Sequence, residues 1–373
     1  MAFATKSLIM STRGRPFSPR LVLESLPMSL FRPPARIVSL VLGLGLMAAA
    51  PAFAQETRIR FQLDWRFEGP AAFFTLPATK GYFKDEKLDV TIDAGNGSGG
   101  TITRIATGTY DMGFADMAAL MEFWGNNPTA PAKPVAVMMV YNNTPAAVLA
   151  LKKSGIKSPA DLNGRKLGAP VFDAGRKGFP IFAKANGLDL AKIQWTSMDP
   201  PLRETMLVRG DVDAITGFYF TSLLNLNARG VKDEDVVILP YPQYGVKLYG
   251  NAIITTEAFL QKNPEAVKAF LRAFTKGLKG VIADPAAGID SVKARDGLID
   301  VALETRRLKL ALAGSVLTAD AKTEGFGEIS PPRLALMASQ VNDAYGLKER
   351  IQPDRIFVQG FLPPKDQRNL FAK

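Results

Sequence analysis

The stretch ATKGYFKDEKLDVTI (residues 78–92) carries a pattern that recurs in the second half of the chain. The first copy continues through a glycine-rich loop and a short helix-like run to ATGTYDMGF (residues 106–114). The second copy reads FAKANGLDLAKIQW (residues 182–195), then TSMDPPLRETMLV (residues 196–208) and RGDVDAITGF (residues 209–218). Each copy therefore predicts a helix, a glycine turn, a strand, a second helix and a buried strand.

One further strand and helix precede each copy. TRIRFQLDW (residues 57–65) with its helix comes before the first copy, and RKLGAPV (residues 165–171) with its helix comes before the second. A strand-helix-strand connection returns the chain parallel to itself, so each half can build a sheet with helices on its faces. We therefore predict an α/β fold of two similar lobes, each a mixed sheet flanked by helices.

Two extended stretches are expected to join the lobes. VAVMMVYNNTPAAVLALKKSGI (residues 135–156) predicts a crossing from lobe one to lobe two. DVVILPYPQYGVKLYGNAIITT (residues 235–256) predicts the crossing back, and its prolines argue against a helix there. Lobe one is then residues 55–140 with 250–373, including the C-terminal helices, and lobe two is residues 141–249. Two crossings predict a hinge with a cleft between the lobes.

The N-terminus has the features of a secretion signal. Arg32 and Arg36 precede the apolar run IVSLVLGLGLMAAA (residues 37–50), and Ala52 and Ala54 form an A-x-A cleavage site. The run is too short for a spanning helix of roughly 20 residues, although a membrane anchor is the alternative. We predict that residues 1–54 are removed, that the start before Met28 is over-extended, and that the mature protein is periplasmic.

Composition removes several classes of chemistry. The chain has no cysteine and no histidine, so disulfides, thiol nucleophiles, Ser-His-Asp triads and histidine-based zinc motifs cannot form. Carboxylate-only and Ser-Lys mechanisms stay possible with this composition, but we expect a binding protein with no catalytic activity, no metal and no cofactor. Six of the 46 basic and one of the 35 acidic residues lie in residues 1–54, which leaves a net charge of +6. No run of five basic residues occurs, so we expect no nucleic-acid partner.

A glycine motif after the strand near residue 90 raises the question of dinucleotide binding. Gly95, Gly97 and Gly100 have G-x-G-x-x-G spacing, and Asp116 follows. In a dinucleotide-binding domain this turn follows the first strand, whereas here a strand and a helix already precede it. We instead expect the turn to present backbone N–H groups to a small anion at a helix N-terminus, or to be a plain connection. The residues concerned are Gly97, Ser98, Gly99, Gly100 and Thr101.

Several blocks resemble the periplasmic substrate-binding proteins of ABC transporters, in the nitrate, sulfonate, taurine and thiamine-pyrimidine group. The blocks are LDW (residues 63–65), KGYFKDEKLDV (residues 80–90), GTYDMGFAD (residues 108–116), SPADLNGRKLG (residues 158–168) and GDVDAITGF (residues 210–218). The resemblance implies a type II-like, two-lobed binding protein. It implies a small-molecule solute, a permease partner in the inner membrane and a monomer.

The ligand class is open at this point. Pyrimidine binders of the group, like the related pyrimidine-synthesising enzymes, use a histidine that this chain lacks. The aromatic run GFYFTS (residues 217–222) favours an organic ligand, and we expect an anionic or zwitterionic, sulfonate- or carboxylate-like solute. A thiamine-precursor pyrimidine, a periplasmic sensor module and a secreted enzyme are the alternatives.

Residues at the ends of strands are the candidate ligand contacts, because ligands bind outside the carboxyl ends of strands in open α/β sheets. Trp65 could instead pack under a helix, Asp116 could cap one, and the basic pair 176–177 could point to solvent rather than to an anion. Beyond the glycine turn, the candidates are Asp64, Trp65, Phe67, Asp116, Met117, Asn142, Asp173, Ala174, Gly175, Arg176, Lys177, Gly217, Phe218 and Tyr219.

Overall fold

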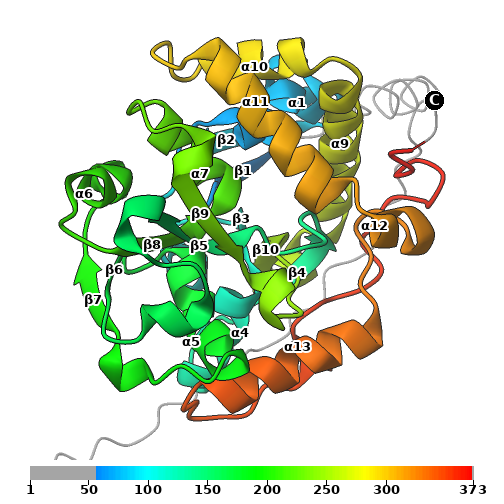
Figure 1. The fold of residues 1–373 in the computed structure, drawn as a ribbon. Coiled ribbons are helices and arrows are strands. Elements are labelled where there is room, and N and C mark those ends of the chain that lie inside the picture. The colour runs from blue at the N-terminus through cyan, green and yellow to red at the C-terminus, as the bar shows by residue number, and fades with distance from the viewer. Residues whose placement is uncertain (1–55, 372–373) are drawn as a thin grey trace, which may run out of the picture. The chain divides into compact units, whose positions relative to one another are not determined.

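Two five-stranded mixed sheets form the framework of the computed structural model, which describes residues 56–371 (Figure 1). The first sheet has the order β2-β1-β3-β10-β4 and the second has the order β7-β6-β8-β5-β9. The strands are β1 (Thr57–Gln62), β2 (Leu88–Asp93), β3 (Met112–Asp116), β4 (Pro134–Met139), β5 (Ala146–Leu151), β6 (Lys166–Ala169), β7 (Gln194–Ser197), β8 (Ala214–Phe218), β9 (Val236–Pro240) and β10 (Asn251–Thr256). We call the first sheet with its helices lobe one and the second lobe two. The predicted fold class is confirmed.

The two sheets repeat one topology. β1 pairs in parallel with β2 and β3, and β6 pairs in parallel with β7 and β8. The antiparallel strand is β10 in the first sheet and β5 in the second. Each of these strands follows a crossing from the other lobe. The helices between strands are α1 (Ala72–Thr79), α2 (Tyr82–Asp85), α3 (Ser98–Ala106), α4 (Met117–Asn126), α5 (Ala174–Ala185), α6 (Arg203–Arg209) and α7 (Tyr219–Asn227). The internal repeat in the sequence therefore corresponds to a repeat in the structure.

The crossings are shorter than the stretches that predicted them. Residues 140–145 join β4 to β5, and residues 241–250 join β9 to β10, because the ends of both predicted stretches belong to strands. The crossings bond to each other, for example from the Gly250 N–H to the Tyr141 carbonyl at 2.8 Å. The expectation that prolines exclude a helix was wrong. Tyr241–Tyr244 is a short 3-10 helix with proline in its first turn, where no N–H is required.

The helices after β10 contact both lobes. They are α8 (Glu257–Lys262), α9 (Pro264–Ala283), α10 (Pro285–Lys293), α11 (Val301–Ala311), α12 (Ala319–Glu324) and α13 (Pro331–Ala344). α9 and α10 pack on α1 in lobe one. α11 packs on α7 of lobe two as well as on α10, and α13 packs on both α4 and α5 (Figure 1). The sequence prediction placed all of these helices with lobe one.

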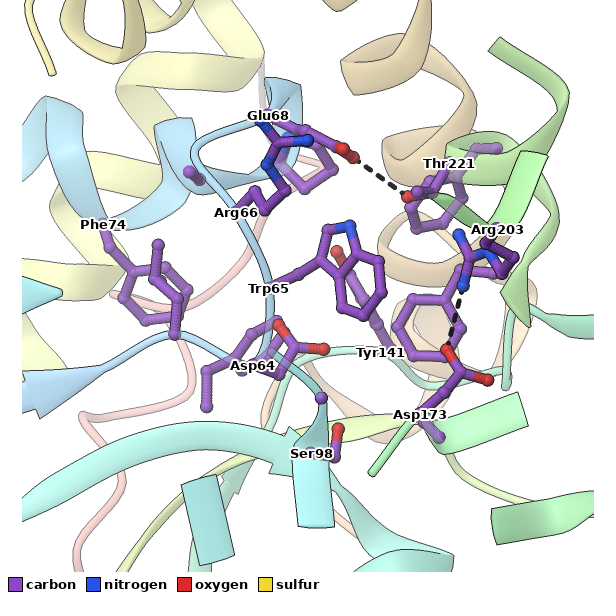
Figure 2. Close-up of a pocket in the computed structure, with 18 residues that line it drawn as sticks. Asp64, Trp65, Arg66, Glu68, Phe74, Ser98, Tyr141, Asp173, Arg203 and Thr221 are labelled. Carbon is purple, nitrogen blue, oxygen red and sulfur yellow. Dashed lines mark hydrogen bonds and ion pairs between the residues drawn. The ribbon is translucent and has the colours of Figure 1, made fainter. Parts of the chain in front are cut away.

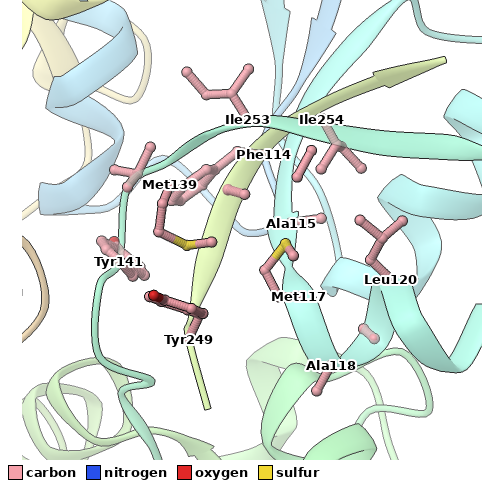
Figure 3. Packing of buried hydrophobic residues seen from close by; sticks show 14 of the residues in the cluster. Phe114, Ala115, Met117, Ala118, Leu120, Met139, Tyr141, Tyr249, Ile253 and Ile254 are labelled. Atoms are coloured by element: carbon pink, nitrogen blue, oxygen red, sulfur yellow. The ribbon is translucent and has the colours of Figure 1, made fainter. Parts of the chain in front are cut away.

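The core of lobe one extends to the crossings. β3 is buried at every position, as expected for a central strand covered on both faces. Figure 3 shows Phe114 of β3 beside Met139 of β4 and Tyr141 of the first crossing. The rings of Phe114 and Tyr141 lie edge to face with their centroids 5.2 Å apart. Tyr141 therefore connects the core of lobe one to the space between the lobes.

Among residues 56–371, no helix is both long and apolar enough to cross a membrane. The predicted secretion signal in residues 1–54 lies outside the described residues.

Candidate ligand-binding pocket

A pocket of about 560 Å³, including its opening to solvent, lies between the two lobes (Figure 2). Most of its walls come from the segments that follow the carboxyl ends of strands β1, β2, β6, β7 and β8, which is where ligands bind in such sheets. Tyr141 of the first crossing forms part of the wall. The lining residues are Leu63, Asp64, Trp65, Arg66, Glu68, Pro70, Ala71, Phe74, Gly97, Ser98, Phe114, Tyr141, Asp173, Ala174, Arg203, Phe218, Phe220 and Thr221.

Asp64 is the acidic group of lobe one nearest the end of β1. Its Oδ2 accepts a hydrogen bond from Asn251 Nδ2 at 2.7 Å. Removal from water raises the pKa of Asp64 to about 7, although the bond from Asn251 lowers it. The negative charges of Asp116 and Asp173 raise the pKa further. The carboxyl group of Asp64 therefore titrates near neutral pH.

Arg203 brings a buried cation to the pocket from lobe two. Its Nη1 donates to Asp173 Oδ2 at 3.1 Å, and its Nε donates to Glu204 Oε1 at 2.8 Å. Its Cζ lies 4.9 Å from the centre of the Trp65 ring in lobe one. Figure 2 shows the indole facing this guanidinium across the pocket. The charge of Arg203 is thus balanced by carboxylates of its own lobe, and its guanidinium carbon lies over the aromatic ring of the other lobe.

Glu68 joins the lobes at another part of the wall. Its Oε2 lies 2.9 Å from Arg307 Nη1 of α11 and accepts a hydrogen bond from Thr221 Oγ1 of α7 at 3.2 Å. Burial raises the pKa of Glu68, and the positive charge of Arg307 opposes this shift. Arg307 also donates to the Thr221 carbonyl at 2.9 Å. Glu68 of lobe one, Thr221 of lobe two and Arg307 of α11 therefore all contact one another.

Aromatic rings supply much of the remaining wall. Tyr141 lies edge to face with Phe218 and with Phe220, at 6.1 Å between centroids in both pairs. Phe74 and Phe114 contribute from lobe one. Apolar, aromatic walls with a few converging polar groups are typical of small-molecule sites. The arrangement can hold an organic ring whose N–H or O–H groups reach the carboxylates.

The structure brings some of the predicted contacts into this pocket and places others elsewhere. Those that line it are Asp64, Trp65, Gly97, Ser98, Asp173, Ala174 and Phe218. Those that do not are Phe67, Gly99, Gly100, Thr101, Asp116, Met117, Asn142, Gly175, Arg176, Lys177, Gly217 and Tyr219.

The basic pair Arg176 and Lys177 does not line the pocket, and its two side chains bond to different partners. Arg176 Nη1 donates to the Ala169 carbonyl at 3.1 Å and to Ser197 Oγ at 2.9 Å. Lys177 Nζ pairs with Glu122 Oε1 of lobe one at 2.9 Å. Both residues lie in α5, and neighbouring positions on a helix do not share a face. Their role as anion contacts therefore has no support from the geometry, and Lys177 instead links the lobes.

The backbone N–H groups of residues 99–101 in the glycine turn bond within the protein. The Gly99 N–H donates to the Phe172 carbonyl of lobe two at 3.2 Å, and the Gly100 and Thr101 N–H groups donate to the Gly97 carbonyl. Asp116 caps α4, because its Oδ1 accepts from the Ala118 and Ala119 N–H groups at 2.9 and 3.1 Å. Of the two alternatives for Asp116, the cap is the one the structure contains.

Sequence reasoning missed several residues of the wall. Glu68 follows the quoted LDW block by three positions and Thr221 lies within the quoted run GFYFTS, so a wider reading of those strand ends would include them. Arg203 had no such signal, because it begins a helix after a loop whose path no periodicity predicts. Tyr141 lies in the crossing, beside the predicted Asn142.

The fold is that of the two-lobed periplasmic binding proteins. The alkanesulfonate-binding protein SsuA from Xanthomonas axonopodis pv. citri, solved bound to MOPS, is similar with a TM-score of 0.64 and 14% identity, over 82% of this chain and 100% of that one. The aliphatic sulphonate-binding protein SsuA from Escherichia coli has a TM-score of 0.61 and 16% identity, over 80% of this chain and 97% of that one.

The family follows from the sequence match. The family model described as NMT1/THI5 like matches residues 71–288, more than half of the chain, and the chain belongs to that family. A putative thiamine biosynthesis protein of Haemophilus influenzae is 29% identical over 65% of this chain and 74% of its own length. The formylaminopyrimidine-binding protein of Halalkalibacterium halodurans is 26% identical, over 67% and 76%. A 4-amino-5-hydroxymethyl-2-methylpyrimidine phosphate synthase of Aspergillus parasiticus is 28% identical, over 62% and 69%. The resemblance predicted from the sequence is confirmed.

Proposed function

We propose that the chain is the solute-binding component of an ABC importer. In this proposal it captures a small organic solute in the pocket between the lobes and delivers it to a permease in the inner membrane. The predicted periplasmic location and the cleavage after Ala54 belong to the same proposal. The fold of the sulfonate-binding proteins and the kinship with a pyrimidine-binding protein support it.

The proposal rests on one observation: both lobes contribute walls to the same pocket. Trp65 comes from lobe one and Arg203 from lobe two, and they meet across the same space. A solute that contacts both walls binds the closed arrangement better than the open one. Such a solute shifts the lobes toward closure, whereas one held equally in both arrangements shifts nothing.

The chemistry of the wall is compatible with the pyrimidine alternative, and the kinship with a pyrimidine-binding protein favours it over the sulfonate-like anion. Arg66 and Arg203 line the wall together with Asp64, Glu68 and Asp173, so the carboxyl groups outnumber the guanidinium groups. Asp64 and Glu68 already accept hydrogen bonds from Asn251 and Thr221, but a carboxylate can accept further hydrogen bonds from N–H donors. We therefore propose an amino-substituted heteroaromatic solute, with its ring against the aromatic residues and its N–H groups toward the carboxyls.

We propose binding without turnover. Relatives named as synthases belong to the matched set, so the distinction from an enzyme needs an experiment. The chain has no histidine or cysteine for general base or nucleophilic chemistry. A bound solute is then expected to be released unchanged.

A direct test compares two probes by calorimetry on the purified chain. We expect 4-amino-5-hydroxymethyl-2-methylpyrimidine to bind and MOPS to bind at least tenfold more weakly. Mass spectrometry of the probe after prolonged incubation is expected to return it unaltered. Tighter binding of MOPS would restore the sulfonate-like prediction, and accumulation of a product would exclude a role in binding alone.

A further inference from the structure

Arg333 of α13 is bonded to both crossings between the lobes. In the first crossing, its Nη1 donates to Asn142 Oδ1 at 2.7 Å, and its Nη2 donates to the Asn142 carbonyl at 2.5 Å and to Asn143 Oδ1 at 3.0 Å. In the second crossing, its Nη2 makes a longer contact of 3.4 Å with the Leu248 carbonyl. Its Cζ lies 4.1 Å from the centre of the Tyr249 ring. One guanidinium group thus contacts both crossings between the lobes.

Other bonds fix the same C-terminal segment to the crossings. The Ser330 N–H, just before α13, donates to the Tyr249 hydroxyl at 2.8 Å. Gln340 Nε2 donates to the Gly245 carbonyl at 2.9 Å, and Gln340 Oε1 accepts from the Lys247 N–H at 2.9 Å. Several points along α13 therefore hold the second crossing, whereas Arg333 is the one among them that also reaches the first.

α13 is in a position to couple the crossings to the lobes. It packs on α4 of lobe one and on α5 of lobe two. Lys184 at the end of α5 donates to the Asp343 carbonyl of α13 at 2.7 Å. Opening of two lobes requires dihedral changes in the residues of the hinge. A rigid, planar fork bonded to both crossings resists independent changes in either of them.

We propose that Arg333 is a positioning residue that holds the two crossings in the closed arrangement and so sets the balance between closed and open lobes. It acts through the crossings and does not line the pocket. The segment that carries it follows residue 288, where the family match ends. This role of Arg333 is the same whichever solute the pocket binds.

The test measures the distance between the lobes by electron paramagnetic resonance in the full chain, without added solute. Because the chain has no cysteine, Lys84→Cys on exposed α2 and Ala191→Cys on the exposed surface of lobe two provide two specific spin-label sites. We expect Arg333→Ala to broaden the distance distribution and to extend it to longer distances. Arg333→Lys keeps the charge but loses the fork, so we expect an intermediate distribution.

Asp320→Ala is the matched control. Asp320 of α12 accepts from Arg333 Nη1 at 2.9 Å but belongs to neither crossing, so its loss is expected to leave the distribution unchanged. If Arg333→Ala does not fold, as judged by circular dichroism, Arg333→Lys and Asn143→Ala decide the question. The wild-type distribution in all variants that fold would overturn the proposal. Equal broadening in Asp320→Ala would also overturn it, because the effect would then come from general loosening of α12 and α13.

Discussion

The guanidinium of Arg203 in lobe two lies over the indole of Trp65 in lobe one, with 4.9 Å between Cζ and the ring centre. Arg203 is fully buried and bonds to two carboxylates, which fixes its plane. Trp65 follows β1 and is half-buried at the pocket wall. The contact therefore joins the two lobes through groups that also form the proposed binding surface.

Trp65→Ala is expected to weaken binding of the aminopyrimidine probe by tenfold or more. The variant loses the aromatic wall and a cation–π contact, which is worth about 0.5–2 kcal/mol depending on how far it is removed from water. Trp195→Ala is the control, because Trp195 forms a similar pair with Arg176, at 4.7 Å, outside the pocket. Calorimetry that finds equal losses in both variants would show that the effect is not specific to the pocket.

Asp64 is expected to make stability depend on pH between about 4 and 7. Its pKa is raised from 3.8 to about 7 by burial, so the folded chain binds more protons than the unfolded chain in this window. The free energy of unfolding therefore falls as pH rises from about 4 to 7. Asp116, whose pKa burial also raises to about 7, acts in the same direction.

The variant Asp64→Asn isolates the contribution of Asp64 to the pH dependence of the free energy of unfolding. We expect the variant to become more stable relative to wild type as pH rises from 4.5 to 7.5, because the neutral amide avoids burying a charge. Thermal unfolding at several pH values measures the difference. Asp290→Asn, on the exposed side of α10, is the control for the loss of a carboxyl group at the surface. A difference between Asp64→Asn and wild type that does not change with pH would disprove the shifted pKa of Asp64.

Gly97→Ala is expected to oppose closure of the lobes. Gly97 has φ of 131°, and a Cβ there would lie 2.4 Å from the Phe172 carbonyl oxygen of lobe two. Gly108→Ala is the matched control, because Gly108 also has a positive φ, of 75°, but open space around its Cβ position. Both variants should unfold at lower temperature than wild type, since alanine disfavours positive φ. Only Gly97→Ala should weaken binding of the probe, and equal affinities in the two variants would argue against the interlobe clash.

Sequence periodicity could predict the two sheets because the internal repeat marks the same strands twice. It could also place Asp64, Ser98, Asp173 and Phe218 at the pocket, since each follows a strand end or closes a strand. It could not orient neighbouring positions on a helix whose start was unknown, so Arg176 and Lys177 were assigned to the pocket.

The sequence could not predict contacts between distant segments, for a different reason. Arg307 meets Glu68, and Arg333 meets Asn142, only because α11 and α13 pack across both lobes. No local pattern specifies where a C-terminal helix docks, and no recognised sequence block covered that part of the chain. The residues that join the lobes therefore emerged from the packing and not from any motif.

A solute held between the two lobes should favour their closure. Small-angle X-ray scattering of the purified chain, with and without saturating 4-amino-5-hydroxymethyl-2-methylpyrimidine, measures this closure in solution. We predict a smaller radius of gyration with the probe, and a reduced change in Gly97→Ala under the same conditions. An unchanged radius in wild type, at a probe concentration where calorimetry shows full occupancy, would show that binding does not close the lobes.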